Sequence, residues 1–426
     1  MKLQRWIMAA LLASVTVLPV GSVEINTRCY PQPITLGVND EGGSDAALIQ
    51  GANLKWVRMT IAWRDTNPSP GVYNWDGPEG VINDAIAKNL KVLAILSTAP
   101  TWAGSNANGT LAPSNITYWQ DFVRAAAIHF KGKVKAYEIW NEPNLTDSGI
   151  GVGWAGDLWT YPTYADYVRA AGIQIHANAP GTLVVGPVTS SQPDARTVEV
   201  FRTLEEIPFP EGNASTFMDV VSFHANANGT DSSATIWSRI SSQLNTRANR
   251  NPSNLGKPVW ITEFGWKSNQ VTETGQRDRI QVIVENMTSD SDAFWNQFPC
   301  GATTKFSHAF IYKEIDSSSS SQGIYRSNAT AKPVITSYLQ TLPAGVHPST
   351  GYLPITVSCS VRTCTFTSGY ADPGDGSRIF DWDFGDGTTG FGRSVVHTYS
   401  HGGQFFVFHG TTNGGFGGDA RLIEIP

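Results

Sequence analysis

Apolar, β-branched runs alternate with amphipathic stretches from residue 35 to residue 315. Several runs are almost continuously apolar, which is typical of strands buried on both faces. Stretches with helical periodicity lie between them, including Asn115–Phe130, Tyr164–Ala177 and Glu273–Thr288. The eight predicted strands are Thr35–Asn39, Lys55–Trp63, Lys91–Ser97, Val134–Asn141, Thr182–Pro187, Met218–Ala225, Pro258–Gly265 and Lys305–Ile315.

Eight strands that alternate with helices predict an α/β fold, a closed (β/α)₈ TIM barrel. An open, doubly wound sheet is the alternative. That fold would bind a ligand at the switch point of its strand order, and no glycine-rich phosphate fingerprint follows the first predicted strand. We therefore favour the barrel.

The character of the sequence changes after Pro343, where Pro, Gly, Ser and Thr dominate and short alternating runs replace the helical stretches. This change predicts a small all-β sandwich over residues 351–426, joined through a linker at 343–350. The barrel domain accordingly covers residues 23–342. Within it, Ser317–Ser321 is expected to form a loop at the barrel mouth, after the eighth strand.

The N-terminus has the pattern of a signal peptide over residues 1–22. Lys2 and Arg5 provide the charged region, Ile7–Leu18 the apolar region, and Val20–Ser22 small residues for cleavage. An uncleaved N-terminal anchor is the alternative, but the apolar run is short for a bilayer span. We expect a secreted, extracellular protein without stable membrane insertion after cleavage.

Four cysteines in an exported chain predict two disulfides. Cys359 and Cys364 are close enough in sequence to join a local hairpin, which leaves Cys29 to pair with Cys300. The topology supports this second pair, because each of these cysteines precedes a strand, the first and the eighth, and those strands are neighbours in a closed barrel.

The composition argues against charged partners. Only 15% of the residues are charged and the net charge is -6, so no basic stripe for nucleic acid is present. The chain has 14 Trp residues, which suit flat, neutral faces such as sugar rings, although most are expected in the core. We found no H-E-x-x-H motif, no Cys-rich cluster and no G-x-S-x-G elbow, and we expect no metal and no cofactor.

Two predicted strands end in glutamates among aromatic and amide side chains. Glu142 follows the fourth strand and Glu263 lies near the end of the seventh. In a TIM barrel the chemistry takes place at these strand ends, and three βα units place the two carboxylates across the mouth from each other. Glycoside hydrolysis uses such a pair. Glu138 is a rival acid, but it lies deeper in the barrel, where a sugar would not reach.

The motifs around these glutamates resemble those of glycoside hydrolase clan A. They are Trp-Asn-Glu-Pro at residues 140–143 and Thr-Glu-Phe-Gly at residues 262–265. The resemblance implies that Glu142 is the acid/base, that Glu263 is the nucleophile, and that anomeric configuration is retained. Residues 56–63 and 67–75 are similar to family 39, which includes β-xylosidases, iduronidases and endo-acting enzymes on bacterial exopolysaccharide.

Further residues are candidates for binding substrate. Arg58 should point into the site and keep Glu263 ionised; a structural ion pair with Glu138 is the alternative. Asn141 offers an amide to the sugar 2-OH. His224 is expected to orient a carboxylate or bind substrate, unless it is only a buried core residue.

One position departs from the clan pattern. Clan members often have a tyrosine two residues after the strand-6 histidine, where this chain has Asn226. This leaves the usual tyrosine partner of the nucleophile in doubt, and Tyr312 is a candidate to line the sugar site instead. Four tryptophans are candidate stacking platforms: Trp63, Trp102, Trp154 and Trp266.

The C-terminal segment resembles a polycystic-kidney-disease (PKD) domain through residues 381–387 (Asp-Trp-Asp-Phe-Gly-Asp-Gly) and 397–399 (His-Thr-Tyr). Trp382 should fill the sandwich core, and Gly-Asp-Gly should form a tight turn. The turn carboxylates are more plausibly solvated than bound to Ca²⁺. Such modules often accompany enzymes that act on polymers, although a spacer role is the alternative.

Together these features predict a secreted, monomeric, retaining glycoside hydrolase, endo-acting on a polysaccharide or oligosaccharide. An exo-acting enzyme such as a β-xylosidase is the first alternative. A carbohydrate-binding barrel without activity is the second, and the presence of both glutamates and Asn141 disfavours it.

Overall fold

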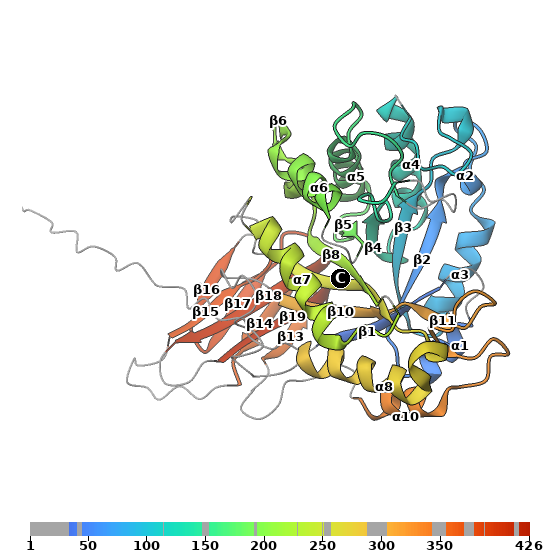
Figure 1. The fold of residues 1–426 in the computed structure, drawn as a ribbon. Coiled ribbons are helices and arrows are strands. Elements are labelled where there is room, and N and C mark those ends of the chain that lie inside the picture. Colours follow the sequence, from blue (N-terminus) through green and yellow to red (C-terminus); the bar gives the residue numbers. More distant parts are fainter. Residues whose placement is uncertain are drawn as a thin grey trace, which may run out of the picture.

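Eight parallel strands close into a barrel in the order β1-β10-β9-β8-β5-β4-β3-β2, which confirms the predicted fold class (Figure 1). They are β1 Thr35–Asn39, β2 Trp56–Ala62, β3 Lys91–Ser97, β4 Val134–Ile139, β5 Leu183–Thr189, β8 Val220–Asn226, β9 Pro258–Gly265 and β10 Lys305–Ile311. This computed structural model describes residues 34–40, 45–113, 115–146, 153–190, 194–227, 229–248, 250, 257–287, 305–342, 355–369, 379–386, 388–412 and 417–426.

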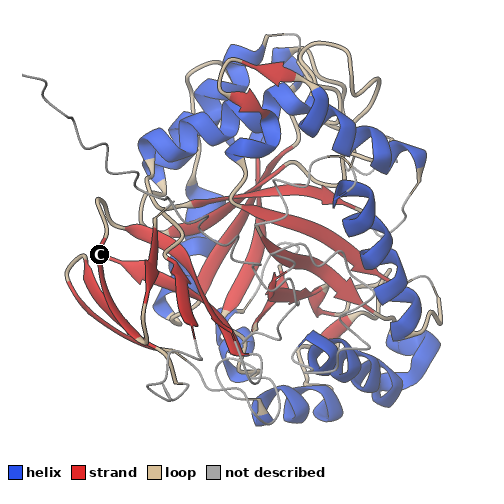
Figure 2. Ribbon diagram, turned by 90° about the vertical axis from the view of Figure 1, so that its left-hand side faces the viewer, coloured by secondary structure: helices blue, strands red, loops and turns tan. Residues whose placement is uncertain are grey.

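Helices surround the barrel, as Figure 2 shows. Polar caps begin several of them: Asn115 accepts a hydrogen bond from the backbone N–H of Thr117, and Thr163 forms a capping box with Asp166. The helices are α1 Ala46–Gly51, α2 Trp63–Thr66, α3 Asp76–Ala87, α4 Ile116–His129, α5 Tyr164–Asn178, α6 Ala195–Glu206, α7 Ser233–Ala248, α8 Ser268–Met287 and α10 Pro333–Thr341.

The eighth barrel strand is shorter than predicted. β10 ends at Ile311, and the chain continues into β11 (Lys313–Ile315), which pairs with β12 (Gly323–Tyr325). A small antiparallel hairpin joins β6 (Pro208–Phe209) to β7 (Gly212–Asn213). Short 3₁₀ turns, η1 (Thr101–Ala103) and η2 (Ala214–Phe217), complete the barrel domain.

The barrel interior has two layers. The lower layer, toward the N-terminal ends of the strands, is an apolar cluster of buried side chains: Trp56, Leu93, Ala136, Leu183, Val185, Val220, Trp260 and Phe310. The upper layer, toward the C-terminal ends, carries the buried polar side chains Arg58, Glu138, His224 and Glu263. We call the C-terminal end of the barrel its mouth, and the opposite end its bottom face.

The C-terminal module is built from two antiparallel sheets, β13-β14-β17 and β16-β15-β18-β19, which confirms a small all-β domain. Trp382 is buried in its core, and a disulfide joins Cys359 to Cys364, as predicted. The strands are β13 Thr356–Ser360, β14 Thr363–Thr367, β15 Ile379–Asp383, β16 Thr389–Phe391, β17 Ser394–Thr398, β18 Gly403–Thr412 and β19 Gly417–Ile425.

This module contacts the bottom face of the barrel. The Gln404 side chain donates to the carbonyl of Lys135 (2.7 Å), and the Gln404 backbone N–H donates to the carbonyl of Gly181 (3.1 Å). Glu424 forms an ion pair with the Lys135 ammonium group. Lys135 lies at the start of β4 and Gly181 just before β5, so the module lies at the opposite end of the barrel from the mouth.

Several predictions fall outside the described residues. These are the signal peptide at 1–22, the Cys29–Cys300 disulfide and the linker at 343–350, and they remain predictions. Within the described ranges, no helix combines the length and the apolar character needed to cross a bilayer.

Candidate active site

The two glutamates reach the mouth through unusual backbone geometry. Glu142 follows β4 with a φ of 46°, and neighbouring Trp140 and Val188 also adopt positive φ values, 68° and 54°. Such values are rare for residues other than glycine, and they cluster at functional sites. The Glu142 N–H donates to the Val188 carbonyl (3.1 Å), which holds this turn against the end of β5.

A bulge in β9 turns Glu263 into the barrel. Phe223 on β8 pairs with Ile261 on β9, and the next residue of β8, His224, pairs with Glu263. β9 therefore has one extra residue, Thr262, between the two pairs. Simple alternation from Trp260, which faces the interior, would have pointed Glu263 outward. Bulges re-aim side chains in this way beside active sites.

Three side chains contact the Glu263 carboxylate. Arg58 Nη1 donates to Oε1 (2.7 Å) and Asn226 Nδ2 donates to Oε2 (2.7 Å). His224 Nδ1 lies 3.4 Å from Oε2. Only 7% of Glu263 is exposed, so this carboxylate is held by charge and hydrogen bonds rather than by water.

His224 lies between the two glutamates. Its Nδ1 is 2.7 Å from Glu142 Oε1, and its Nε2 is 3.1 Å from Arg58 Nη2. A guanidinium group can only donate, so Nε2 must accept, and the ring proton is assigned to Nδ1. We infer that a neutral His224 donates its Nδ1–H to Glu142.

Arg58 connects this network to the residues around it. Its Nε donates to Glu138 (2.5 Å) and its Nη2 donates to Asn141 Oδ1 (3.1 Å). The amide of Asn39, oriented to satisfy both of its groups, accepts from Arg58 Nη1 (3.2 Å) and donates to the carbonyl of Thr262 (3.2 Å). Arg58 is therefore paired with Glu138 and with Glu263 at the same time.

Burial sets the protonation of the site. It raises the pKa of Glu142 to about 7, against the positive charge of Arg58. It lowers the pKa of His224 to about 4, so the ring is neutral at neutral pH. Burial also raises the pKa of Glu263, and because His224 is neutral, Arg58 is the charge that favours the ionised form of Glu263.

Glu142, His224 and Glu263 are also residue types that can bind a metal cation. One donor atom from each of Glu142, His224 and Glu263 lies within 4.8 Å of the others. However, Arg58 already places a positive charge 2.7 Å from Glu263, and it occupies the second nitrogen of His224. A second cation here would be repelled.

Comparison with known proteins identifies the barrel. A sequence model of the cellulases (glycosyl hydrolase family 5) matches residues 24–299, more than half of the chain. The chain belongs to glycoside hydrolase family 5. A PKD-domain model matches residues 347–414 of this family 5 protein. The predicted clan is thereby confirmed, whereas the narrower likeness to family 39 is supported only by the similarity in fold reported next.

Solved structures share the fold of this family 5 glycoside hydrolase at low sequence identity. A family 39 enzyme from Bacteroides cellulosilyticus WH2 is 14% identical with a TM-score of 0.54, over 93% of this chain and 79% of that one. GH5_18 from Streptomyces cattleya in complex with GlcNAc is 13% identical, with a TM-score of 0.54 over 75% and 83%. An exo-β-1,4-mannosidase from Opitutaceae bacterium strain TAV5 is 14% identical, with a TM-score of 0.51 over 72% and 58%.

Half of the ten residues that sequence patterns suggested for this family 5 site meet in the structure. Arg58, Asn141, His224, Glu142 and Glu263 form the connected network described above. Two partners of it were not foreseen. One is Asn226, noted from the sequence only as a departure from the clan pattern. The other is Asn39, and its position at the end of the first strand is the one feature of the sequence that could have indicated it.

For three of the four tryptophans, the prediction that the ring stacks on a sugar is wrong. Trp63, Trp154 and Trp266 are at most 1% exposed and pack in the core between strands and helices, where no sugar can reach their faces. Trp63, for example, stacks on Phe122 with ring centres 5.4 Å apart.

Trp102 and Tyr312 are half-buried and remain candidates. The Trp102 Nε1–H donates to the carbonyl of Asn67 (2.7 Å), which fixes the ring near the loop after β2. Tyr312 follows β10 directly, and its backbone N–H donates to the carbonyl of Phe264 (2.8 Å), next to the nucleophile candidate in sequence.

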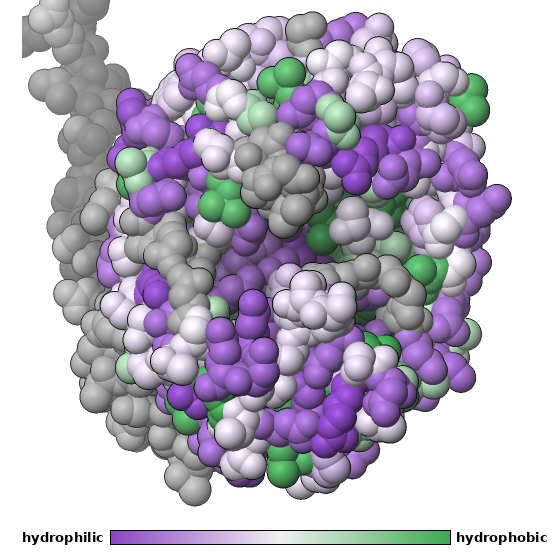
Figure 3. Space-filling model, turned by 45° about the vertical axis from the view of Figure 1, so that its right-hand side comes forward, coloured by the Kyte–Doolittle hydropathy of each residue, from purple (hydrophilic) through white to green (hydrophobic). Residues whose placement is uncertain are grey.

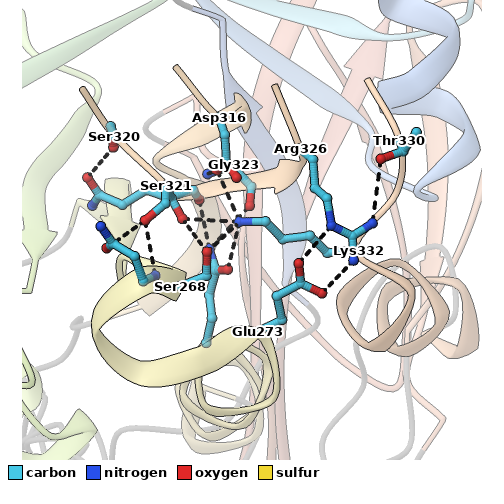
Figure 4. A network of polar contacts seen from close by, with 12 residues as sticks. Ser268, Glu273, Asp316, Ser320, Ser321, Gly323, Arg326, Thr330 and Lys332 are labelled. Carbon is cyan, nitrogen blue, oxygen red and sulfur yellow. Dashed lines mark hydrogen bonds and ion pairs between the residues drawn. The ribbon is translucent and has the colours of Figure 1, made fainter. Parts of the chain in front are cut away.

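A buried lysine joins the loops that follow β9 and β10 (Figure 4). Lys332 is 1% exposed, and its ammonium group donates to four acceptors: Ser268 Oγ, Gln276 Oε1, Asp316 Oδ1 and the carbonyl of Ser321, at 3.0 to 3.2 Å. The segment after Tyr312 is thereby tied to the start of α8.

Proposed function

We propose that this family 5 glycoside hydrolase is a secreted, retaining enzyme that acts within a neutral polysaccharide chain. One observation carries the retaining mechanism: one carboxylate oxygen of Glu142 and one of Glu263 lie within 4.8 Å of each other. Retaining enzymes have their carboxyl groups about 5–5.5 Å apart, whereas inverting enzymes leave about 6.5–9.5 Å for a water.

The environment of each carboxyl group assigns its role. Glu263 accepts from the charged Arg58 and from Asn226, which favours an ionised nucleophile. Glu142 contacts only the neutral His224 ring among these side chains, and its pKa of about 7 leaves it protonated in mildly acidic solution. The two environments therefore separate the nucleophile from the acid.

The reaction then follows in two steps. A Glu263 oxygen bonds to the anomeric carbon while the bond to the leaving oxygen breaks, and that oxygen takes the proton of Glu142. In the second step a water gives a proton to Glu142, its oxygen bonds to the anomeric carbon, and the bond to Glu263 breaks. The Asn141 side-chain carbonyl is held by Arg58, which leaves its NH₂ group for the sugar 2-OH.

Export and a polymeric substrate rest on other features. The signal-peptide pattern at residues 1–22 supports secretion, and the PKD-type module supports a polymer. Figure 3 shows a hollow with a largely hydrophilic lining on a side turned away from the module, which suits a substrate rich in hydroxyl groups.

Product analysis tests this proposal. Hydroxyethyl cellulose, xylan and glucomannan would be digested, with the first-formed anomer followed by NMR and the products sized by chromatography. We expect the substrate configuration in the first product and a mixture of oligosaccharides. An initial product of opposite configuration would contradict retention. Release of a single small sugar from chain ends would instead establish exo action.

A further inference from the structure

Two exposed aromatic side chains lie in the loop that connects β4 to α5. Trp159 is 37% exposed and Tyr161 is 65% exposed. Among the described Phe, Tyr and Trp residues of the barrel domain, these two are the exposed ones. Isolated exposed apolar residues are common, so the way in which Trp159 is held decides whether this pair is a site.

Trp159 is fixed on α6 by polar contacts. Its Nε1–H donates to Glu199 Oε2 (2.7 Å), and the guanidinium carbon of Arg202 lies 5.0 Å from its ring centre. Glu199 and Arg202 also pair with each other at 2.9 Å. One edge and one face of the indole are therefore occupied, and we infer that the exposed area of Trp159 includes the remaining face.

The loop itself is also anchored. Arg196, in the first turn of α6, donates to the carbonyls of Trp154 (2.5 Å) and Gly156 (2.9 Å). The backbone N–H of Trp159 donates to Asp157 Oδ1 (2.9 Å). The open indole face thus has a defined orientation, which lowers the entropic cost of stacking a ligand on it.

The position of this loop relates it to the reaction. Glu142, which we assign as the acid, lies at the start of the segment between β4 and α5 that ends with Trp159 and Tyr161. Because the acid protonates the leaving oxygen, this segment is on the leaving-group side of the mouth. In a βα barrel each helix runs back from the mouth, and Glu199 is about 7.5 Å along α6 from its N-cap Asp194 at 1.5 Å per residue. Trp159, which donates to Glu199, therefore lies on the outer surface of the barrel, to the side of the mouth.

We propose that Trp159, with Tyr161, forms a remote binding site for the leaving-group part of a neutral polysaccharide; this rests on the proposed function. A pyranose ring stacks on the free indole face, and its hydroxyl groups bond to the half-exposed Glu199 and Arg202. Two rings are far too small for a stable protein interface, which buries about 800 Å² per partner. A sugar ring matches both the size and the mixed apolar and polar character.

Affinity electrophoresis tests the site separately from catalysis. In a Glu263→Gln background, migration would be compared in gels containing hydroxyethyl cellulose, xylan or glucomannan. The variants are Trp159→Ala, Trp159→Phe and, as a matched control, Phe391→Ala, which removes a 70% exposed aromatic ring from the module. We expect Trp159→Ala to weaken binding to at least one polymer roughly fivefold, the value of one aromatic contact, with Trp159→Phe in between and Phe391→Ala unchanged.

Activity supplies the second readout. With Glu263 intact, Trp159→Ala should leave the hydrolysis of a small aryl glycoside unchanged and raise KM for the polymer. Unchanged retardation of Trp159→Ala in all three gels overturns the site, as does loss restricted to Phe391→Ala, or an equal loss of activity on the aryl glycoside. Failure of the proposed function would appear differently, as absence of polymer products from the unsubstituted enzyme.

Discussion

The lower and upper layers of the barrel interior share strands, and on β2 and β4 they are only two residues apart, yet they differ in chemistry. On β2, Trp56 belongs to the lower layer and Arg58 to the upper one; on β4, Ala136 lies below Glu138. Both layers are buried. The lower layer is an apolar cluster, whereas the upper layer holds polar side chains, among them the charged Arg58 and its carboxylate partners.

Each layer suits a different task. In the lower layer the rings of Trp56 and Trp260 meet edge to face at 5.3 Å, and Trp260 lies 4.1 Å from His308, whose pKa burial holds well below its usual range. Such packing fills the barrel and stabilises it. In the upper layer, burial strengthens the field that Arg58 exerts on Glu263. The comparison implies that substitutions in the upper layer should change the rate of the reaction. Substitutions in the lower layer should change the free energy of unfolding.

The largest effect is expected in the upper layer. Glu263→Ala removes the proposed nucleophile and should lower kcat by roughly 10⁴-fold or more, because no covalent intermediate forms. Added azide should restore some activity and give product of inverted configuration. Glu142→Ala is the companion variant, and it should retain activity on aryl glycosides with good leaving groups. Hydrolysis of polymer by either variant at the unsubstituted rate would contradict the assignment.

In the lower layer, Trp260→Ala should cost stability instead. Trp260 is fully buried, and truncation leaves a cavity that costs about 3–5 kcal/mol. Thermal and urea unfolding would measure the loss, and Trp260→Phe should lose less. Well below the unfolding temperature, the kcat of Trp260→Ala should stay close to that of the unsubstituted enzyme. A kcat loss as large as that of Glu263→Ala would show that the layers do not separate chemistry from stability.

A smaller effect is expected from Glu138, which pairs with Arg58 in the upper layer. The acid must be protonated, so kcat/KM should fall above about pH 7, the pKa of Glu142. Glu138→Gln removes a negative charge that offsets Arg58, and the less compensated Arg58 should lower the pKa of Glu142. The alkaline limb of the profile should therefore move to lower pH, by about half a unit to one unit. An unmoved limb, or one moved upward, would show that Glu138 has only a structural role.

The smallest effect concerns the bottom face, where the module contacts the barrel. A Cβ atom on Gly181 would lie 2.1 Å from the Cα of Gly403. Gly181→Ala should therefore separate the module from the barrel and leave hydrolysis of small substrates unchanged. Gly104→Ala is the control, because Gly104 has a similar positive φ and no atom within 4 Å of the added group. Small-angle scattering should show a more extended protein for Gly181→Ala alone.

The sequence by itself determined the barrel and its catalytic candidates. Apolar runs buried on both faces are local signals, and they placed the strands to within a few residues. Trp-Asn-Glu-Pro at residues 140–143 follows a strand, and Thr-Glu-Phe-Gly at residues 262–265 ends one. Because strands alternate with helices along the chain, both motifs come to the same mouth. Two cysteines five residues apart likewise predicted the Cys359–Cys364 disulfide, because the chain between them can only form a tight turn.

Only the tertiary structure decided which way individual side chains face. Like Trp102, the residues Trp63, Trp154 and Trp266 lie after barrel strands, but their burial between strands and helices depends on the neighbouring elements and not on local pattern. Alternation predicted that Arg58 faces inward, whereas the inward direction of Glu263 depends on the bulge in β9, which is defined only by pairing with β8 and β10. A contact between segments distant in the chain depends on how the elements pack. The hydrophobic periodicity within one segment therefore cannot predict it.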